Sequence, residues 1–207
     1  MQLIDTIGVY WGPRTETARE CADRLLTYLQ ELSRANPVLA TWYVKQRDRK
    51  APKVAVPLDG NKLLGIVTAG ANRRDAGGDA MESLGFRLAL WNGHEDSQSF
   101  GLSIKCGLFE QNPNLGNAAV VTVPSDVASK ADAQALSKQI LVHGIEAWEA
   151  DWGAIFFSGS SVLQQRVGNG PFLDRALWIK DSQVLEKIGA TSTRRELLLD
   201  GTLVHRD

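Results

Sequence analysis

Three apolar runs stand close together in the middle of the sequence, at 85–91, 100–106 and 118–123. The segments between them are short and contain the turn-forming residues Asn92-Gly93 and Asn112-Pro113-Asn114. Short connections with such residues join neighbouring antiparallel strands, so the three runs predict a β-meander. An antiparallel sheet is therefore the central expectation for this chain.

Two longer segments show the periodicity of helices. Apolar residues from Ala18 to Leu32 recur three and four positions apart, which predicts one buried helical face. Thr15 is the predicted N-cap of this helix, and Asn36-Pro37 should end it. A second helix is predicted from about Lys130 to Trp148, and a shorter one follows Asp59 or Asn61.

Strands complete the expected fold. Their predicted ranges are 4–11, 41–44, 152–157, 175–179 and 196–199. In the first, Ile7, Val9 and Trp11 should face one side of the sheet, and Gly8 and Tyr10 the other. The order of elements predicts an α+β fold in which a mixed, mostly antiparallel sheet packs with two main helices. We expect residues 1–207 to form a single domain.

Composition excludes several classes of protein. Of the 207 residues, 43% are hydrophobic and 23% are charged, which is typical of a globular chain. The net charge of −1 argues against a nucleic-acid partner. We find no apolar run long enough to span a membrane and no basic, apolar leader, so we expect a cytoplasmic protein. Cys21 and Cys106 should then be reduced, buried thiols.

No catalytic or cofactor motif is complete. Three scattered histidines and two cysteines make no zinc signature, and the glycines near residue 70 match no phosphate-binding loop. The turn 158–161 follows an apolar strand but lacks the second glycine of a hydrolase nucleophile elbow. A hydrolase that uses Ser160 or a carboxylate pair remains an alternative hypothesis, and it predicts a deep pocket that gathers Ser160, His143 and an acid such as Asp151. No cofactor is expected.

Charge is unevenly distributed along the chain. Residues 88–165 contain 3 basic and 8 acidic residues, whereas residues 1–87 contain 13 basic and 10 acidic residues. An ordinary solvated surface is the simplest interpretation. The functional alternative is an acidic face that attracts a basic protein partner, and paired catalytic carboxylates are a third possibility. The predicted partner-binding residues are Glu95, Asp96, Glu110, Glu146, Glu149 and Asp151.

An ordered series of short motifs resembles the immunity protein 52 family of bacterial polymorphic toxin systems. The likeness extends from about residue 5 to residue 160, and Tyr10–Arg14 is its most distinctive part. The motifs are Tyr10-Trp11-Gly12-Pro13-Arg14, Cys21-Ala22 with Arg24-Leu25, Trp42-Tyr43-Val44-Lys45, Asn72-Arg73-Arg74-Asp75, Leu84-Gly85-Phe86, Leu90-Trp91-Asn92-Gly93, and Trp148 with Asp151-Trp152-Gly153.

The resemblance implies a small cytoplasmic α+β protein, not an enzyme, that binds and neutralises a cognate toxin. In this family the toxin is typically a nuclease of the restriction-endonuclease-like class, often delivered by a type VI secretion system. A basic nuclease cleft would suit the acidic residues of the middle segment. The alternatives are the small hydrolase and a protein-interaction adaptor that is not an antitoxin. The sequence leaves the oligomeric state open.

Overall fold

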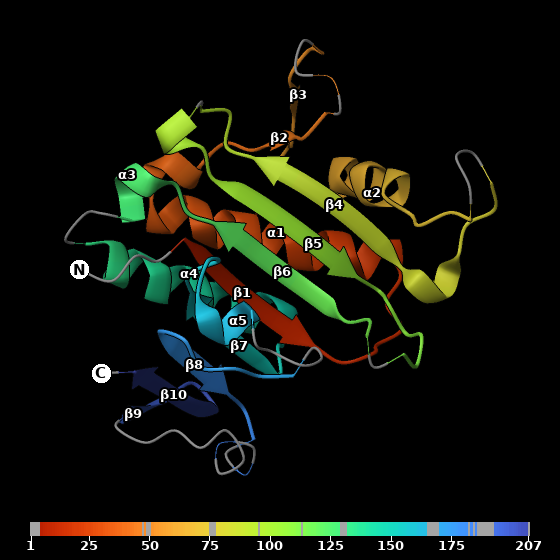
Figure 1. Cartoon of the computed structure of the whole chain (residues 1–207). Coiled ribbons are helices and arrows are strands. Elements are labelled where there is room, and N and C mark those ends of the chain that lie inside the picture. The colour runs from red at the N-terminus through yellow and green to blue at the C-terminus, as the bar shows by residue number, and fades with distance from the viewer. Residues whose placement is uncertain are drawn as a thin grey trace.

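A long antiparallel sheet runs through the computed structural model of the chain (Figure 1). The structure describes residues 5–46, 48, 51–74, 78–94, 96–112, 114–128, 132–164, 170–181, 183, 185 and 193–206. Within these residues, ten strands join in the order β3-β2-β4-β5-β6-β1-β7-β8-β10-β9. The strands are β1 (Thr6–Trp11), β2 (Tyr43–Val44), β3 (Val54–Ala55), β4 (Phe86–Trp91), β5 (Gly101–Cys106), β6 (Asn117–Thr122), β7 (Trp152–Phe156), β8 (Ala176–Ile179), β9 (Thr193–Leu198) and β10 (Gly201–Arg206).

Few helices accompany this sheet, and the fold is α+β as predicted. The helices are α1 (Ala18–Ala35), α2 (Gly60–Ala69), α3 (Ser125–Ala128), α4 (Ala133–Trp148) and α5 (Ser161–Gln164), with short 3-10 turns η1 (Pro37–Leu39), η2 (Glu82–Leu84) and η3 (Asp96–Gln98). The predicted meander is confirmed as β4, β5 and β6. The sheet was expected to be mixed, but every strand pairing among the described residues is antiparallel.

Helix α1 starts two residues later than predicted. Its N-cap is Thr17, whose hydroxyl accepts a hydrogen bond from the Glu20 N–H at 3.2 Å. The Glu20 carboxylate in turn accepts the Thr17 N–H at 2.7 Å, which completes a capping box. This exchange holds the pKa of Glu20 below its ordinary value, chiefly through the Thr17 N–H. The prediction of Thr15 was wrong because Thr15 lacks a Glu or Gln three positions later, whereas Thr17 has one.

The main core lies between one face of the sheet and the helices α1, α2 and α4. Figure 1 shows α1 and α4 together behind the central strands, with α2 beside β4. The two faces of β1 separate as predicted: Ile7, Val9 and Trp11 belong to this core, whereas Tyr10 packs against a smaller cluster on the other face. Cys21 and Cys106 are both free thiols buried in the main core.

The opposite face of the sheet is covered over only part of its width. Over β7, β8 and β10, Phe172 and Leu185 pack on apolar strand residues and form the smaller cluster. Over β4 and β5 the outward positions are exposed, among them Arg87, Ser103 and Lys105. Antiparallel sheets commonly leave one face to solvent, and here the alternation of buried and exposed residues follows that rule. Among the described residues, the sheet therefore presents an open face around β4 and β5.

The last hairpin was predicted only in part. Strand β9 turns back into β10 through Leu199 and Asp200, and Leu199 has a positive φ of 54°. The prediction of a strand near 196–199 is confirmed, but β10 was missed. Asp200-Gly201 is a hairpin signal that would have revealed β10.

The same hairpin is tied to α4 by a charged contact that predicts a pH effect. Glu196 accepts hydrogen bonds from Lys138 at 2.8 Å and from His205 at 3.0 Å, and these contacts lower its pKa from 4.5 to about 2. A lowered folded-state pKa adds stability above pH ~4.5, which is lost as the pH falls toward 2. Because Glu196 is 36% exposed, we expect Glu196→Gln to cost only about 0.5 kcal/mol at pH 6. Urea unfolding should show this difference vanishing by pH 2, and a difference that stays constant with pH would contradict the prediction.

Candidate functional site

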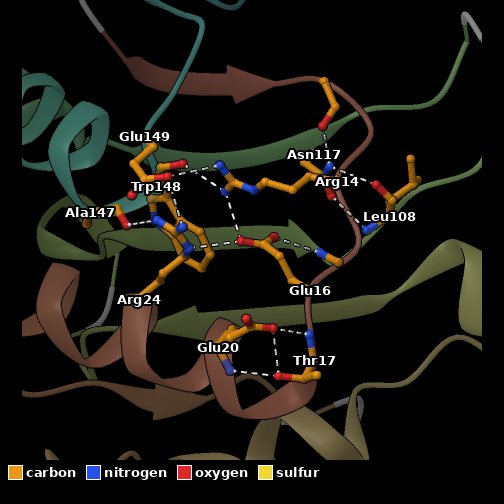
Figure 2. A network of polar contacts seen from close by, with 12 residues as sticks. Arg14, Glu16, Thr17, Glu20, Arg24, Leu108, Asn117, Ala147, Trp148 and Glu149 are labelled. Carbon is orange, nitrogen blue, oxygen red and sulfur yellow. Dashed lines mark hydrogen bonds and ion pairs between the residues drawn. The ribbon is translucent and has the colours of Figure 1, made fainter.

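A buried carboxylate organises the polar network at the start of α1 (Figure 2). The side chain of Glu16 is 4% exposed, and its Oε1 lies 2.9 Å from Arg14 Nη2 and 2.9 Å from Arg24 Nε. Its other oxygen accepts the backbone N–H of Gly107 at 3.3 Å. The carboxylate therefore joins the end of β1, helix α1 and the loop that follows β5.

The two arginines of this network also hold the C-terminus of α4. Arg14 donates to the carbonyl oxygen of Trp148 at 3.0 Å, and Arg24 donates to that of Ala147 at 3.2 Å. Both groups belong to the last turn, where carbonyls lack helical partners and attract cations. Arg24 further pairs with Glu149 at 3.0 Å, and this contact lowers the pKa of that carboxyl. Glu149 ends the helix in the left-handed conformation, with φ 47°.

The side chains of Asn117 and Asp151 hold the backbone of the segment Gly12–Arg14 at Gly12. Asn117 donates to the carbonyls of Gly12 and Leu108 and accepts the Leu108 N–H at 2.9 Å. Asp151 accepts the Gly12 N–H at 2.8 Å. The motif Tyr10–Arg14 thus serves to join three separate parts of the chain, and the structural role of Arg14 and Arg24 is evident from these contacts.

Tryptophans pack next to this network. Trp11 and Trp148 stack with their ring centroids 5.0 Å apart, and the Arg14 guanidinium lies 5.6 Å above the Trp11 ring. Trp42, Trp148 and Trp178 are among the largest fully buried side chains. Most of the tryptophans therefore belong to the core.

A hollow of about 480 Å³ lies on the open sheet face beside the network. Its floor comes from β5, β6, β1 and β7, and the loop that leads into β6 forms a wall. The lining combines a stacked aromatic pair with charged and amide side chains, and includes Tyr10, Lys105, Asn114, Leu115, Asp151 and Trp152. Such a mixture of apolar and oriented polar groups suits recognition of another molecule.

The predicted acidic residues do not form one surface. Glu110 follows β5 and Asp151 precedes β7. The C-terminal end of β5 and the N-terminal end of β7 lie at the same end of the sheet, so Glu110 and Asp151 lie at that end too. Glu146 and Glu149 lie at this end too, in the last turn of α4 and at its C-cap. Asp96 lies in η3 between β4 and β5, at the opposite end, and its side chain is outside the described part, as is the whole of Glu95. The directions of the strands therefore place most of the predicted acidic residues at one end of the sheet and Asp96 at the other end.

The predicted acidic residues also differ in their ion pairs. Glu149 is compensated by Arg24 and by Arg14, whose Nη1 lies 3.5 Å away. Glu110 is exposed, and Glu146 is exposed with His143 Nδ1 3.8 Å from its carboxylate. A basic partner would therefore meet Glu110 and Glu146 more readily than Glu149.

The predicted arrangement of Ser160 with Asp151 fails on geometry. Asp151 precedes β7 and Ser160 follows it, and a five-residue strand separates its ends by about 16 Å. The Ser160 hydroxyl accepts the N–H of Leu163 at 3.3 Å, so it caps the short helix α5. Ser160 and Asp151 cannot meet in one pocket, and the predicted triad is corrected accordingly.

Two other kinds of site are not found in the described ranges. No group of three or more His, Cys, Asp or Glu residues there is placed to hold a metal ion. Among the same residues, no helix combines the length and apolar character needed to cross a membrane.

The structure defines an α+β protein whose antiparallel sheet is open over part of one face. The Glu16 network fixes the loops at one end of this sheet, and Ser160 and Asp151 do not meet in a catalytic triad. The family model of immunity protein 52 matches residues 5–179. The chain belongs to this family, and the resemblance seen in the sequence motifs is confirmed.

A solved structure and the curated proteins give two further comparisons. The fold is similar to that of the Pseudomonas aeruginosa T6SS protein PA0821, with a TM-score of 0.53 and 12% sequence identity over 98% of this chain and 68% of that one. This likeness concerns the fold. The search of curated proteins gave no match.

Proposed function

We propose that this chain is an immunity protein that binds a cognate bacterial toxin and neutralises it. Membership of the immunity protein 52 family is the observation that carries the proposal. The fold similarity to a T6SS protein supports a place in a type VI secretion system. In this proposal the toxin is a nuclease of the restriction-endonuclease-like class, met in the cytoplasm.

The proposed mechanism is occlusion of the toxin's active site without chemistry by the immunity protein. Occlusion needs a surface that is formed before the encounter, because ordering it on binding would cost affinity. The Glu16 network supports such a surface, since it fixes the loops at one end of the sheet through contacts with α1 and α4.

Co-expression tests the proposal directly. Cells that express the toxin encoded beside this chain's gene should stop growing, and cells that also express this chain should grow. Purified chain should inhibit the nuclease stoichiometrically and compete with its DNA substrate. Growth arrest despite equal expression of both proteins would refute the immunity function, whereas inhibition without competition would refute occlusion.

Charge reversal tests the acidic contact. We expect Glu110→Lys and Glu146→Lys each to slow association with the toxin by about three- to tenfold and to make the rate less dependent on salt. Asp132→Lys is the matched control, because this exposed acid lies at the opposite end of α4. Stopped-flow association rates at several salt concentrations give the measurement. Equal rates for all three variants and the unchanged chain would exclude this surface.

A further inference from the structure

Five residues line up in register across the sheet face opposite α1 and α4, from its open part at β4 to its covered part at β7. Cross-strand pairing sets Arg87 opposite Lys105, Lys105 opposite Ala118, Ala118 opposite Tyr10, and Tyr10 opposite Trp152. We call these five residues the cross-strand row. With strands about 4.8 Å apart, the row extends over about 19 Å from β4 to β7.

Two cations occupy one end of the cross-strand row. Arg87 and Lys105 are exposed, and the described residues offer no ion pair to either of them. Like charges directly opposite on neighbouring strands destabilise a sheet. The outward positions of β4, β5 and β6 hold no acid that could relieve this repulsion. The pair is therefore an unfavourable arrangement that an incoming anionic group would stabilise.

Aromatic rings occupy the other end. Tyr10 and Trp152 stack with centroids 4.0 Å apart and an interplanar angle of 15°. The Tyr10 ring lies back over Gly8, where an added Cβ would stand 2.4 Å from the Tyr10 hydroxyl oxygen. Glycine at this position thus lets the ring lie flat on the sheet. The rings and Lys105 all line the hollow on the open face.

Small side chains and an apolar wall complete this surface. Ala118 separates the cations from the aromatic pair, so the row has a low centre. Beside it, the loop before β6 contributes Leu115, which lines the hollow and is 37% exposed. Exposed apolar side chains around a hollow are typical of interaction surfaces.

We propose that the cross-strand row is a toxin-binding surface and that it receives a carboxylate-bearing segment of the toxin. Arg87 and Lys105 bind the carboxylates, and Tyr10 and Leu115 pack against the apolar part of the segment. This inference rests on the proposed function and names the part of the partner that the open face recognises. It is compatible with the acidic contact at Glu110 and Glu146, because a metal-dependent nuclease holds carboxylates within a basic cleft.

The test compares Lys105→Glu with Lys62→Glu. Lys62 is an exposed lysine of α2, on the helix-covered side of the sheet. Binding is measured by calorimetry against the toxin encoded beside this chain's gene, with its catalytic residue inactivated. We expect Lys105→Glu to weaken the Kd by about 10-fold or more, and Lys62→Glu to change it less than about twofold.

Thermal unfolding separates this effect from misfolding. Lys105→Glu places a carboxylate opposite Arg87, so the Tm should rise by about 1–3 °C while binding is lost. The double variant Arg87→Glu with Lys105→Glu restores like charges and should lower the Tm again without restoring binding.

The outcomes distinguish the inference from the function on which it rests. If the unchanged chain fails to bind the toxin, the proposed function is wrong. If the unchanged chain binds and Lys105→Glu binds equally well, the function stands and the cross-strand row is excluded. Salt-dependent binding of single-stranded DNA that disappears in Lys105→Glu, with toxin affinity retained, would assign the cations to a nucleic acid and overturn the inference.

Discussion

Replacing Glu16 with alanine should lower the free energy of unfolding by about 3–5 kcal/mol. The carboxylate is 4% exposed and lies between two guanidinium groups that are themselves only 29% and 23% exposed. Its removal leaves Arg14 and Arg24 facing each other with less compensation, and the Gly107 N–H loses its acceptor. Urea unfolding, followed by tryptophan fluorescence, measures the loss.

Glu149 supplies the matched control, because it pairs with the same two arginines. Its side chain is 65% exposed, so water screens the pair, and we expect Glu149→Gln to cost less than about 1 kcal/mol. If Glu16→Ala proved no more costly than Glu149→Gln, burial would not be what makes the Glu16 contacts strong.

The second large effect is expected at Trp148. This side chain is 0% exposed and stacks on Trp11, so Trp148→Ala removes a large apolar group from a packed core. Substitutions of this kind cost about 3–5 kcal/mol. The loss should appear as a lower urea midpoint with an unchanged slope, since the folded and unfolded states keep their compactness.

Replacing Trp148 with phenylalanine tests whether lost ring packing causes the loss of stability. The Trp148 indole N–H is buried without a hydrogen-bond partner among the described residues, so phenylalanine keeps ring packing and removes an unsatisfied donor. We expect Trp148→Phe to cost about half as much as Trp148→Ala or less. Equal losses for the two variants would show that ring packing against Trp11 adds little.

The substitutions at Glu16 and Trp148 should affect function by lowering the amount of folded protein. Variants of Glu16 or Trp148 should protect cells less because less folded protein is present, and the folded fraction should retain its toxin affinity. Lys105→Glu should behave in the opposite way, with a stable fold and weak binding. Affinity and stability measured side by side therefore separate the residues that hold the fold from those that contact the toxin.

Local signals predicted most of the elements. The three- and four-residue spacing between Ala18 and Leu32 predicted α1, and Asp59, one of the two predicted N-caps, is the N-cap of α2. Alternation predicted which residues of β1 face each side. Such signals depend on backbone geometry over a few residues, so one sequence suffices to detect them. Where a local signal was overlooked, as with the Asp200-Gly201 turn before β10, the element was missed.

The candidate sites could not be predicted from such local signals. Arg87 and Lys105 stand at outward positions of two strands that the pattern predicted, but only the register sets one opposite the other. Glu16 finds Arg24 on α1 and Gly107 after β5, and strand direction sends Glu110 and Asp96 to opposite ends of the sheet. Counting acids along the chain could not reveal this division.

The amino-acid pattern alone was thus enough to establish an α+β chain with an antiparallel meander, a helix-covered face and a family resemblance. Folding in three dimensions decided which charges are compensated, which lie unpaired on the open face, and which groups meet. The physical reason is that periodicity and capping act between near neighbours. Register and layer packing join residues such as Arg14 and Trp148, which are 134 positions apart.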